Sequence, residues 1–104
     1  MSLQIIQLPP ARRDMTKHFF HLAKESRRVA SRFFDAAQKT FATLAENPGH
    51  GGLWENDNPD LKGLRVWPVK GFNRHLVFYI ADEARIRIVR VLHSSQDIDS
   101  IFGS

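Results

Sequence analysis

The spacing of apolar residues changes once along this 104-residue chain, from a helical period to a period of two after about residue 60. A segment with apolar residues at i, i+3, i+4 and i+7 buries one face as a helix, whereas an alternating segment buries one face as a strand. The change of period therefore predicts helices in the first half and a sheet in the second. With a short strand in front, the expected class is α+β.

The first half predicts one short strand and two helices. Residues 3–8 form a brief apolar run that Pro9 and Pro10 stop, since proline donates no ladder hydrogen bond. Ser26 is a suitable N-cap for the second helix, and the Asn47-Pro48-Gly49 segment ends it. The apolar stripes are Ala11, Met15, Phe19, Leu22 and Ala23 in the first helix, and Ala30, Phe33, Phe34, Ala37, Phe41, Leu44 and Ala45 in the second.

The second half predicts a loop, three strands and a last helical turn. Residues 49–60 are rich in glycine, asparagine, aspartate and proline, and they indicate a loop that Leu53 and Trp54 anchor. Residues 62–70, 74–81 and 85–93 are three β-type runs with hairpin-length turns between them, so neighbouring strands should be antiparallel. Residues 94–102 suggest a short helix. The expected architecture is one domain over residues 1–104, ordered β-α-α-β-β-β, with a helical hairpin packed on one face of an antiparallel sheet.

Alternation in the last strand predicts which side chains share a sheet face. Ile86, Ile88 and Leu92 fall on one face together with Arg90, and the helices should cover that face. Arg90 would then need a carboxylate, for which Asp97 or Asp99 could serve. The other face would be basic and partly aromatic, because it gathers Arg65, Trp67, Tyr79, Arg85, Arg87 and His93. Such a face is typical of a surface that binds phosphates, stacked bases or an acidic helix. It is equally typical of a sheet face that is exposed to solvent and has no partner.

Charge and composition narrow the classes of function. Lys and Arg number 15 against 11 Asp and Glu, giving a net charge of +4 and a pI near 10.0, so an acidic partner or a polyanion is expected. The absence of cysteine excludes cysteine proteases, thiolate zinc sites and disulfide scaffolds. With no secretory signal pattern and no membrane-length apolar run, the expected location is the cytoplasm.

Motifs of small-molecule enzymes are missing. The chain has no nucleophile elbow and no glycine-rich phosphate loop, so no cofactor is expected. His18 and His21 have a metal-ligand spacing, but no third ligand stands nearby in the sequence, and we predict no metal site. His93, near Arg90 and Asp97, has the chemistry of a general acid or base, and it equally suits a structural role at a strand end.

Three segments resemble a known toxin superfamily. They are Arg65-Val66-Trp67-Pro68-Val69, then Arg74-His75-Leu76-Val77-Phe78-Tyr79, then the run Ile88-Val89-Arg90-Val91-Leu92-His93-Ser94-Ser95-Gln96-Asp97. Together with the helical hairpin and the leading strand, they resemble the ParE branch of the ParE/RelE superfamily. The resemblance implies the toxin of a type II toxin–antitoxin system, of the kind linked to plasmid stabilisation. It also implies a cognate ParD-like antitoxin that wraps an acidic, apolar tail around the toxin. DNA would be contacted only through that antitoxin.

The superfamily contains two mechanisms, and both stay open at this stage. RelE-like members cut messenger RNA on the ribosome with basic residues on the sheet and a Tyr or His near the tail; here that set would be His93, Arg90, Arg74 and Arg65. The tail from Ser94 to Phe102 has no Arg, Lys, Tyr or His, which favours the ParE-like alternative. ParE-like members arrest growth by binding DNA gyrase, without catalytic residues. The residues expected to contact the target or the antitoxin are Arg65, Trp67, Phe72, Arg74, Tyr79, Arg87, Arg90 and His93, with Trp54 as a further anchor.

Overall fold

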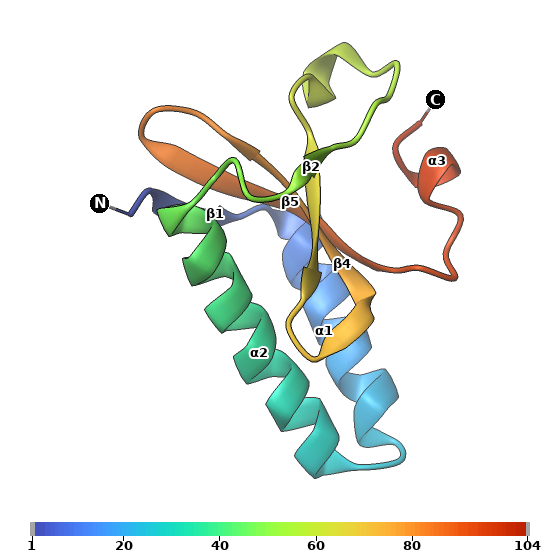
Figure 1. Ribbon diagram of the computed structural model, residues 1–104. Coiled ribbons are helices and arrows are strands. Elements are labelled where there is room, and N and C mark those ends of the chain that lie inside the picture. Colours follow the sequence, from blue (N-terminus) through green and yellow to red (C-terminus); the bar gives the residue numbers. More distant parts are fainter. Residues whose placement is uncertain (1, 104) are drawn as a thin grey trace.

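The computed structural model describes residues 2–103 and confirms the α+β class (Figure 1). Two long helices lie side by side against a five-stranded sheet. Ser26 caps the second helix as predicted, since its Oγ accepts a hydrogen bond of 3.2 Å from the backbone N–H of Val29. The elements are β1 (Gln4–Gln7), α1 (Pro9–Ala23), α2 (Arg27–Glu46), β2 (Gly52–Leu53), a 3₁₀ turn η1 (Pro59–Leu61), β3 (Arg65–Val69), β4 (Phe72–Ala81), β5 (Arg85–His93) and α3 (Ile98–Ile101).

The strand order is β1-β5-β4-β3-β2. The antiparallel pairing predicted for β3, β4 and β5 is confirmed, but the sheet as a whole is mixed, because β1 runs parallel to β5. β2 is a two-residue edge strand within the segment predicted as a loop, and it pairs with Arg65 and Val66. Two residues are too short for an alternating pattern, so no sequence signal distinguishes β2 from a loop.

A β-bulge in β5 shifts the alternation on which the face assignment was based. Phe78 stands opposite Arg90 and Tyr79 stands opposite Ile88, which leaves Val89 as an extra residue. Beyond the bulge, Val91 packs on the same side as Ile86 and Ile88, and Leu92 packs on the opposite side. The prediction that Leu92 shares a face with Ile86 and Ile88 is therefore wrong.

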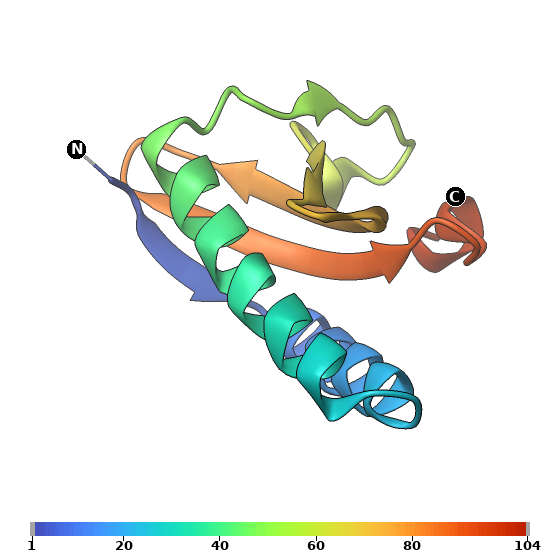
Figure 2. The ribbon, with the colours of Figure 1, turned by 60° about the horizontal axis from the view of Figure 1, so that its bottom comes forward.

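The sheet separates two apolar clusters. Figure 2 shows the two long helices on one side of the sheet. The helix-side core joins both long helices to the sheet, and its buried members are Ala11, Met15, Phe33, Ala37, Phe41, Leu44, Ala45, Val69, Val77, Tyr79, Ile86, Ile88 and Val91. The far-side core consists of Leu64, Phe78, Leu92 and Phe102, and it is covered by partly buried residues of the 54–61 segment and of α3.

The far-side core corrects the prediction of a basic, partly aromatic second face. Trp67 and Tyr79 belong to the helix side of the sheet, and the far side is chiefly apolar and covered. Arg87 does lie away from the helices, in an ion pair of 3.7 Å with Asp82.

Among residues 2–103 no helix is long and apolar enough to cross a membrane.

Candidate interaction surfaces

An open apolar groove lies on the helical hairpin. It has a volume of about 540 Å³ and runs between α1 and α2 beside the end of β1. Two of its phenyl groups are strongly exposed, with 64% of Phe20 and 43% of Phe34 accessible to solvent. The residues that line this hairpin groove are Gln7, Arg12, Met15, Thr16, Phe19, Phe20, Phe34 and Gln38. Exposed aromatic surface rimmed by polar groups is typical of a protein-binding site.

The two exposed phenylalanines were not singled out from the sequence as contact residues. Phe20 lies outside the apolar stripe of α1, and an aromatic residue off the core stripe is a signal for an exposed contact. Phe34 was assigned to the apolar stripe of α2, because it directly follows Phe33 and fits the same spacing. The structure buries Phe33 completely and leaves Phe34 at the edge of that stripe.

Tyr79 and Arg65 are held by the segment that follows α2. The Tyr79 side chain is fully buried; its hydroxyl donates to the carbonyl of Pro48 and accepts from the N–H of Gly51, both at 2.8 Å. Burial raises the pKa of this hydroxyl. Arg65 Nη1 donates to the carbonyl of Gly51 at 2.6 Å. Tyr79 thus fastens the chain after α2 to the sheet and offers no surface to a partner.

Trp67 and Phe72, two other predicted contact residues, are partly buried. Trp67 packs against the helix-side core, and the imidazole of His50 lies on it with a ring-centroid distance of 4.1 Å. Phe72 packs edge-on against Phe33 with its ring centroid 5.3 Å away. Both residues therefore keep part of their surface while they anchor β3 and β4 to α2.

Arg90 does not pair with Asp97 or Asp99, as the sequence suggested, but with Asp14 of α1. Its Nε and Nη2 donate to the two carboxylate oxygens at 2.6 and 2.8 Å, and Asp14 also accepts from the N–H of Val91 at 3.0 Å. These hydrogen bonds raise the pKa of Arg90. The ion pair clamps α1 onto β5.

His93 belongs to a cluster of three imidazoles at the end of the sheet. His75 of β4 lies 4.9 Å from His18 of α1 and 5.0 Å from His93, measured between ring centroids, and both contacts are edge-to-face. Burial lowers the pKa of His18, and burial with the neighbouring histidines lowers that of His75 to about 4. His18 Nε2 lies 2.7 Å from the carbonyl of Val91, so it acts as the donor. Residues 2–103 contain no group of side chains arranged as a metal site.

The four residues named for ribonuclease chemistry are not gathered at one place. Arg74 and His93 lie at the same end of the sheet, where the N–H of Ser94 donates to the carbonyl of Arg74 at 2.7 Å. Arg65 stands opposite Tyr79, about 13 Å further along β4 from His75, the partner of His93. Arg90 is bound by Asp14. Two of the three arginines, Arg65 and Arg90, are therefore occupied by structural contacts.

Comparison with known proteins identifies the family. The family model described as "ParE toxin of type II toxin-antitoxin system, parDE" matches residues 5–98. The chain belongs to the ParE toxin family. No curated protein matches it. Among solved structures, a chain titled "Chromosomal ParDE TA system from P. aeruginosa" is similar in fold, with a TM-score of 0.71 and 13% sequence identity. The match covers 88% of this chain and 96% of that one. ParE toxins belong to type II toxin–antitoxin systems, so the resemblance read from the sequence is confirmed.

Proposed function

We propose that this ParE-family toxin arrests growth by binding DNA gyrase and that a cognate ParD-like antitoxin neutralises it. The observation that supports a binding mechanism is the engagement of Arg65 by the carbonyl of Gly51 and of Arg90 by Asp14. A ribonuclease needs free cations to stabilise the phosphate in the transition state, together with a group that takes the proton of the 2′-hydroxyl. Here two of the cations from such a set maintain the fold.

The hairpin groove is the proposed antitoxin site. An acidic, apolar segment would bury the exposed faces of Phe20 and Phe34, and Arg12 at the rim would meet its carboxylates. Buried aromatic residues supply most of the affinity of such interfaces, whereas rim charges chiefly set recognition and the association rate.

The target is tested with two assays on the purified toxin. We expect the protein to inhibit gyrase supercoiling and to leave ribosome-bound messenger RNA uncut. Cleaved messenger with normal supercoiling would replace the proposal with the RelE-like endoribonuclease. His93→Ala separates the two mechanisms in cells: growth arrest should persist if the toxin acts by binding, whereas its loss in a folded variant indicates catalysis.

The antitoxin site is tested with one variant and a matched control. Phe20→Asp places a charge in the hairpin groove, so it should keep growth arrest but escape neutralisation by the co-expressed antitoxin. Leu53→Asp alters another exposed apolar residue, 67% accessible and on β2 at the other edge of the sheet, and it should remain neutralised. Neutralisation of both variants to the same degree would remove the hairpin groove from the proposal.

A further inference from the structure

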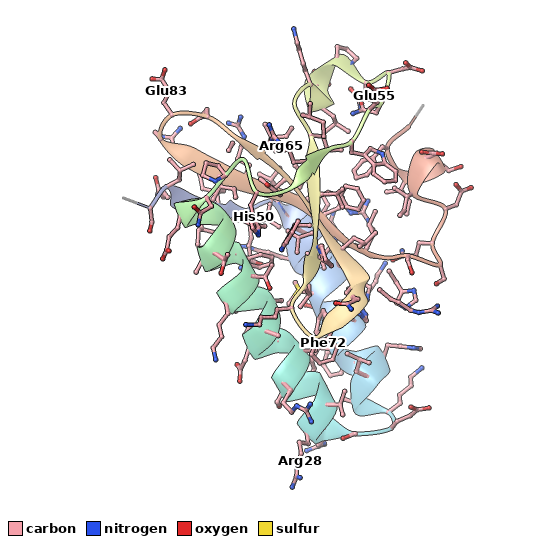
Figure 3. The ribbon with its side chains drawn as sticks, in the orientation of Figure 1. Arg28, His50, Glu55, Arg65, Phe72 and Glu83 are labelled. Carbon is pink, nitrogen blue, oxygen red and sulfur yellow. The ribbon has the colours of Figure 1, made fainter. Side chains whose placement is uncertain are left out.

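A second groove runs between α2 and the β3–β4 hairpin, and its chemistry differs from that of the hairpin groove. It has a volume of about 940 Å³ and contains three cations, Arg32, Lys39 and Lys70, against one carboxylate, Asp35. We call it the basic groove. In Figure 3, His50 marks the end of this groove near the start of β3, and Phe72 marks the end at the β3–β4 turn.

The cations of the basic groove are available to a ligand. Arg32 and Lys39 are exposed and lie seven residues apart on α2, which is two helical turns or about 10 Å along the axis. Lys70 faces them from the β3–β4 turn. Within residues 2–103, none of these three side chains has an acidic partner within ion-pair distance. Unpaired cations on both walls of a groove favour an extended anion over a single acidic group.

The walls of the basic groove are fixed in place. Thr40 Oγ1, on α2, donates to the carbonyl of Ala36 at 2.8 Å and accepts from the backbone N–H of Lys70 at 3.2 Å. This contact ties the β3–β4 turn to the helix. The groove is therefore formed before any ligand arrives, which lowers the entropic cost of binding.

An aromatic pair stands within the same groove. The exposed imidazole of His50 lies 4.1 Å from the ring of Trp67, at an angle of 54°. Stacking of an unpaired base on an aromatic side chain is sequence-tolerant, and it is the usual complement to a basic groove that follows a nucleic-acid backbone. The hairpin groove has the opposite character, because exposed phenyl groups suited to a protein segment dominate its lining.

We propose that the basic groove binds a single strand of nucleic acid. Arg32, Lys39 and Lys70 contact successive phosphates, and one base stacks on the His50–Trp67 pair. A duplex keeps its bases paired and cannot place one on His50, so the single strand is the favoured form. The inference differs from the expectation that DNA is reached only through the antitoxin, and it does not depend on gyrase as the target.

The test is fluorescence anisotropy of a labelled oligothymidylate of about 12 nucleotides with the purified full-length chain. Neutralisation of three phosphates of a single strand gives a slope of about −2 in log affinity against log salt. We therefore expect roughly 20-fold weaker binding at about 200 mM than at about 50 mM salt. Binding that is undetectable at the lower salt would overturn the proposal.

Two charge-reversal variants of equal net charge locate the site. Lys39→Glu with Lys70→Glu should weaken binding at least about tenfold and flatten the salt slope. Lys17→Glu with Lys62→Glu changes two exposed lysines outside the groove and should cost far less. Equal losses would mean that overall charge attracts the strand without a defined site, and would overturn the proposal.

A third variant tests the stacking contact, and a competitor tests the class of ligand. His50→Ala should weaken binding about fivefold and keep the salt slope, because it removes a base contact and no phosphate contact. If His50→Ala binds the oligonucleotide as tightly as the wild type, no base stacks on His50. A polyglutamate peptide should compete poorly with the oligonucleotide; efficient competition that is lost in the Lys39/Lys70 variant would assign the groove to an acidic protein segment instead.

Discussion

The two sides of the sheet are stabilised in different ways. On the helix side, directional contacts accompany the apolar packing: Asp14 binds Arg90, and Tyr79 binds the backbone at Pro48 and Gly51. The far-side core is apolar, and it is covered by short segments, η1 with its flanking loop and the four-residue α3. The helix side therefore fixes the orientation of the helices, whereas the far side depends on the area that its cover buries.

This difference bears on the two proposed binding surfaces. The hairpin groove and the basic groove both include side chains of α2, the longest helix. Neither groove includes a residue of α3. Loss of the far-side cover should therefore leave both surfaces intact, whereas loss of a helix-side clamp should affect both.

The largest effect is expected from Asp14→Ala. Its side chain is 6% exposed and accepts three hydrogen bonds, so the change leaves the Val91 N–H and the Arg90 guanidinium without their acceptor. We expect a loss of about 3–4 kcal/mol in the free energy of unfolding, measured by urea denaturation. Asp35→Ala removes an exposed carboxylate of α2 and should stay within about 0.5 kcal/mol of the wild type. A cost below about 1 kcal/mol for Asp14→Ala would show that the clamp does not stabilise the helix side.

A smaller and more local effect is expected from Phe102→Ala. Phe102 is 5% exposed and packs against Phe78 with a ring-centroid distance of 4.9 Å. The substitution should cost about 2–3 kcal/mol in the free energy of unfolding. This is less than the usual cost of replacing a buried phenylalanine by alanine, because α3 can detach while the sheet persists. Hydrogen exchange should rise in residues 94–103 and stay unchanged in α1 and α2. Equal acceleration in the helices would mean that the two sides unfold as one unit.

The sequence predicted the elements better than it predicted their faces. Helical spacing and the Ser26 cap located α2, and alternation with short turns located β3, β4 and β5. The bulge at Val89 follows from the pairing of β5 with β4, and no local signal announces it. That single extra residue moved Leu92 to the far side, and it explains why strict alternation failed.

The candidate site was predictable in part. The strand motifs, together with the helical hairpin and the leading strand, indicated the toxin family, and the family comparison confirms it. The partner of Arg90 was not predictable, because Asp14 lies 76 residues away and reaches Arg90 only through the packing of α1 on β5. The groups of the basic groove come from α2, from the segment after it and from the β3–β4 turn, so they converge only in three dimensions.

The histidine cluster makes the helix side sensitive to pH. The pKa of His75 is about 4 in the folded protein and about 6.5 in the unfolded chain, so the unfolded chain binds the proton more readily. The stability that depends on neutral His75 is therefore fully present above about pH 6.5, and it is lost as the pH falls toward 4. We expect a loss on the order of 2 kcal/mol.

The cluster is tested by urea denaturation of two variants between pH 7 and pH 4. His75→Gln should remove most of this dependence on pH, since glutamine does not titrate. His50→Gln removes an exposed histidine outside the cluster and should keep the slope of the wild type. If both variants keep that slope, other groups cause the loss in acid.

The smallest effect is expected at the contact that ties the chain after α2 to the sheet. Tyr79→Phe removes the hydroxyl that joins the Pro48 carbonyl to the Gly51 N–H, and it leaves that buried N–H without an acceptor. We expect a cost of about 1–2 kcal/mol, below that of Asp14→Ala because no charge is left unpaired. Gly51→Ala should disturb the same contact from the other side, since a Cβ there would lie 2.7 Å from both the Tyr79 hydroxyl and the carbonyl oxygen of Val66. Gly52→Ala meets no atom within 4 Å and serves as the matched control. If Gly51→Ala and Gly52→Ala cost the same, the close packing of Tyr79 on Gly51 is not what holds this segment.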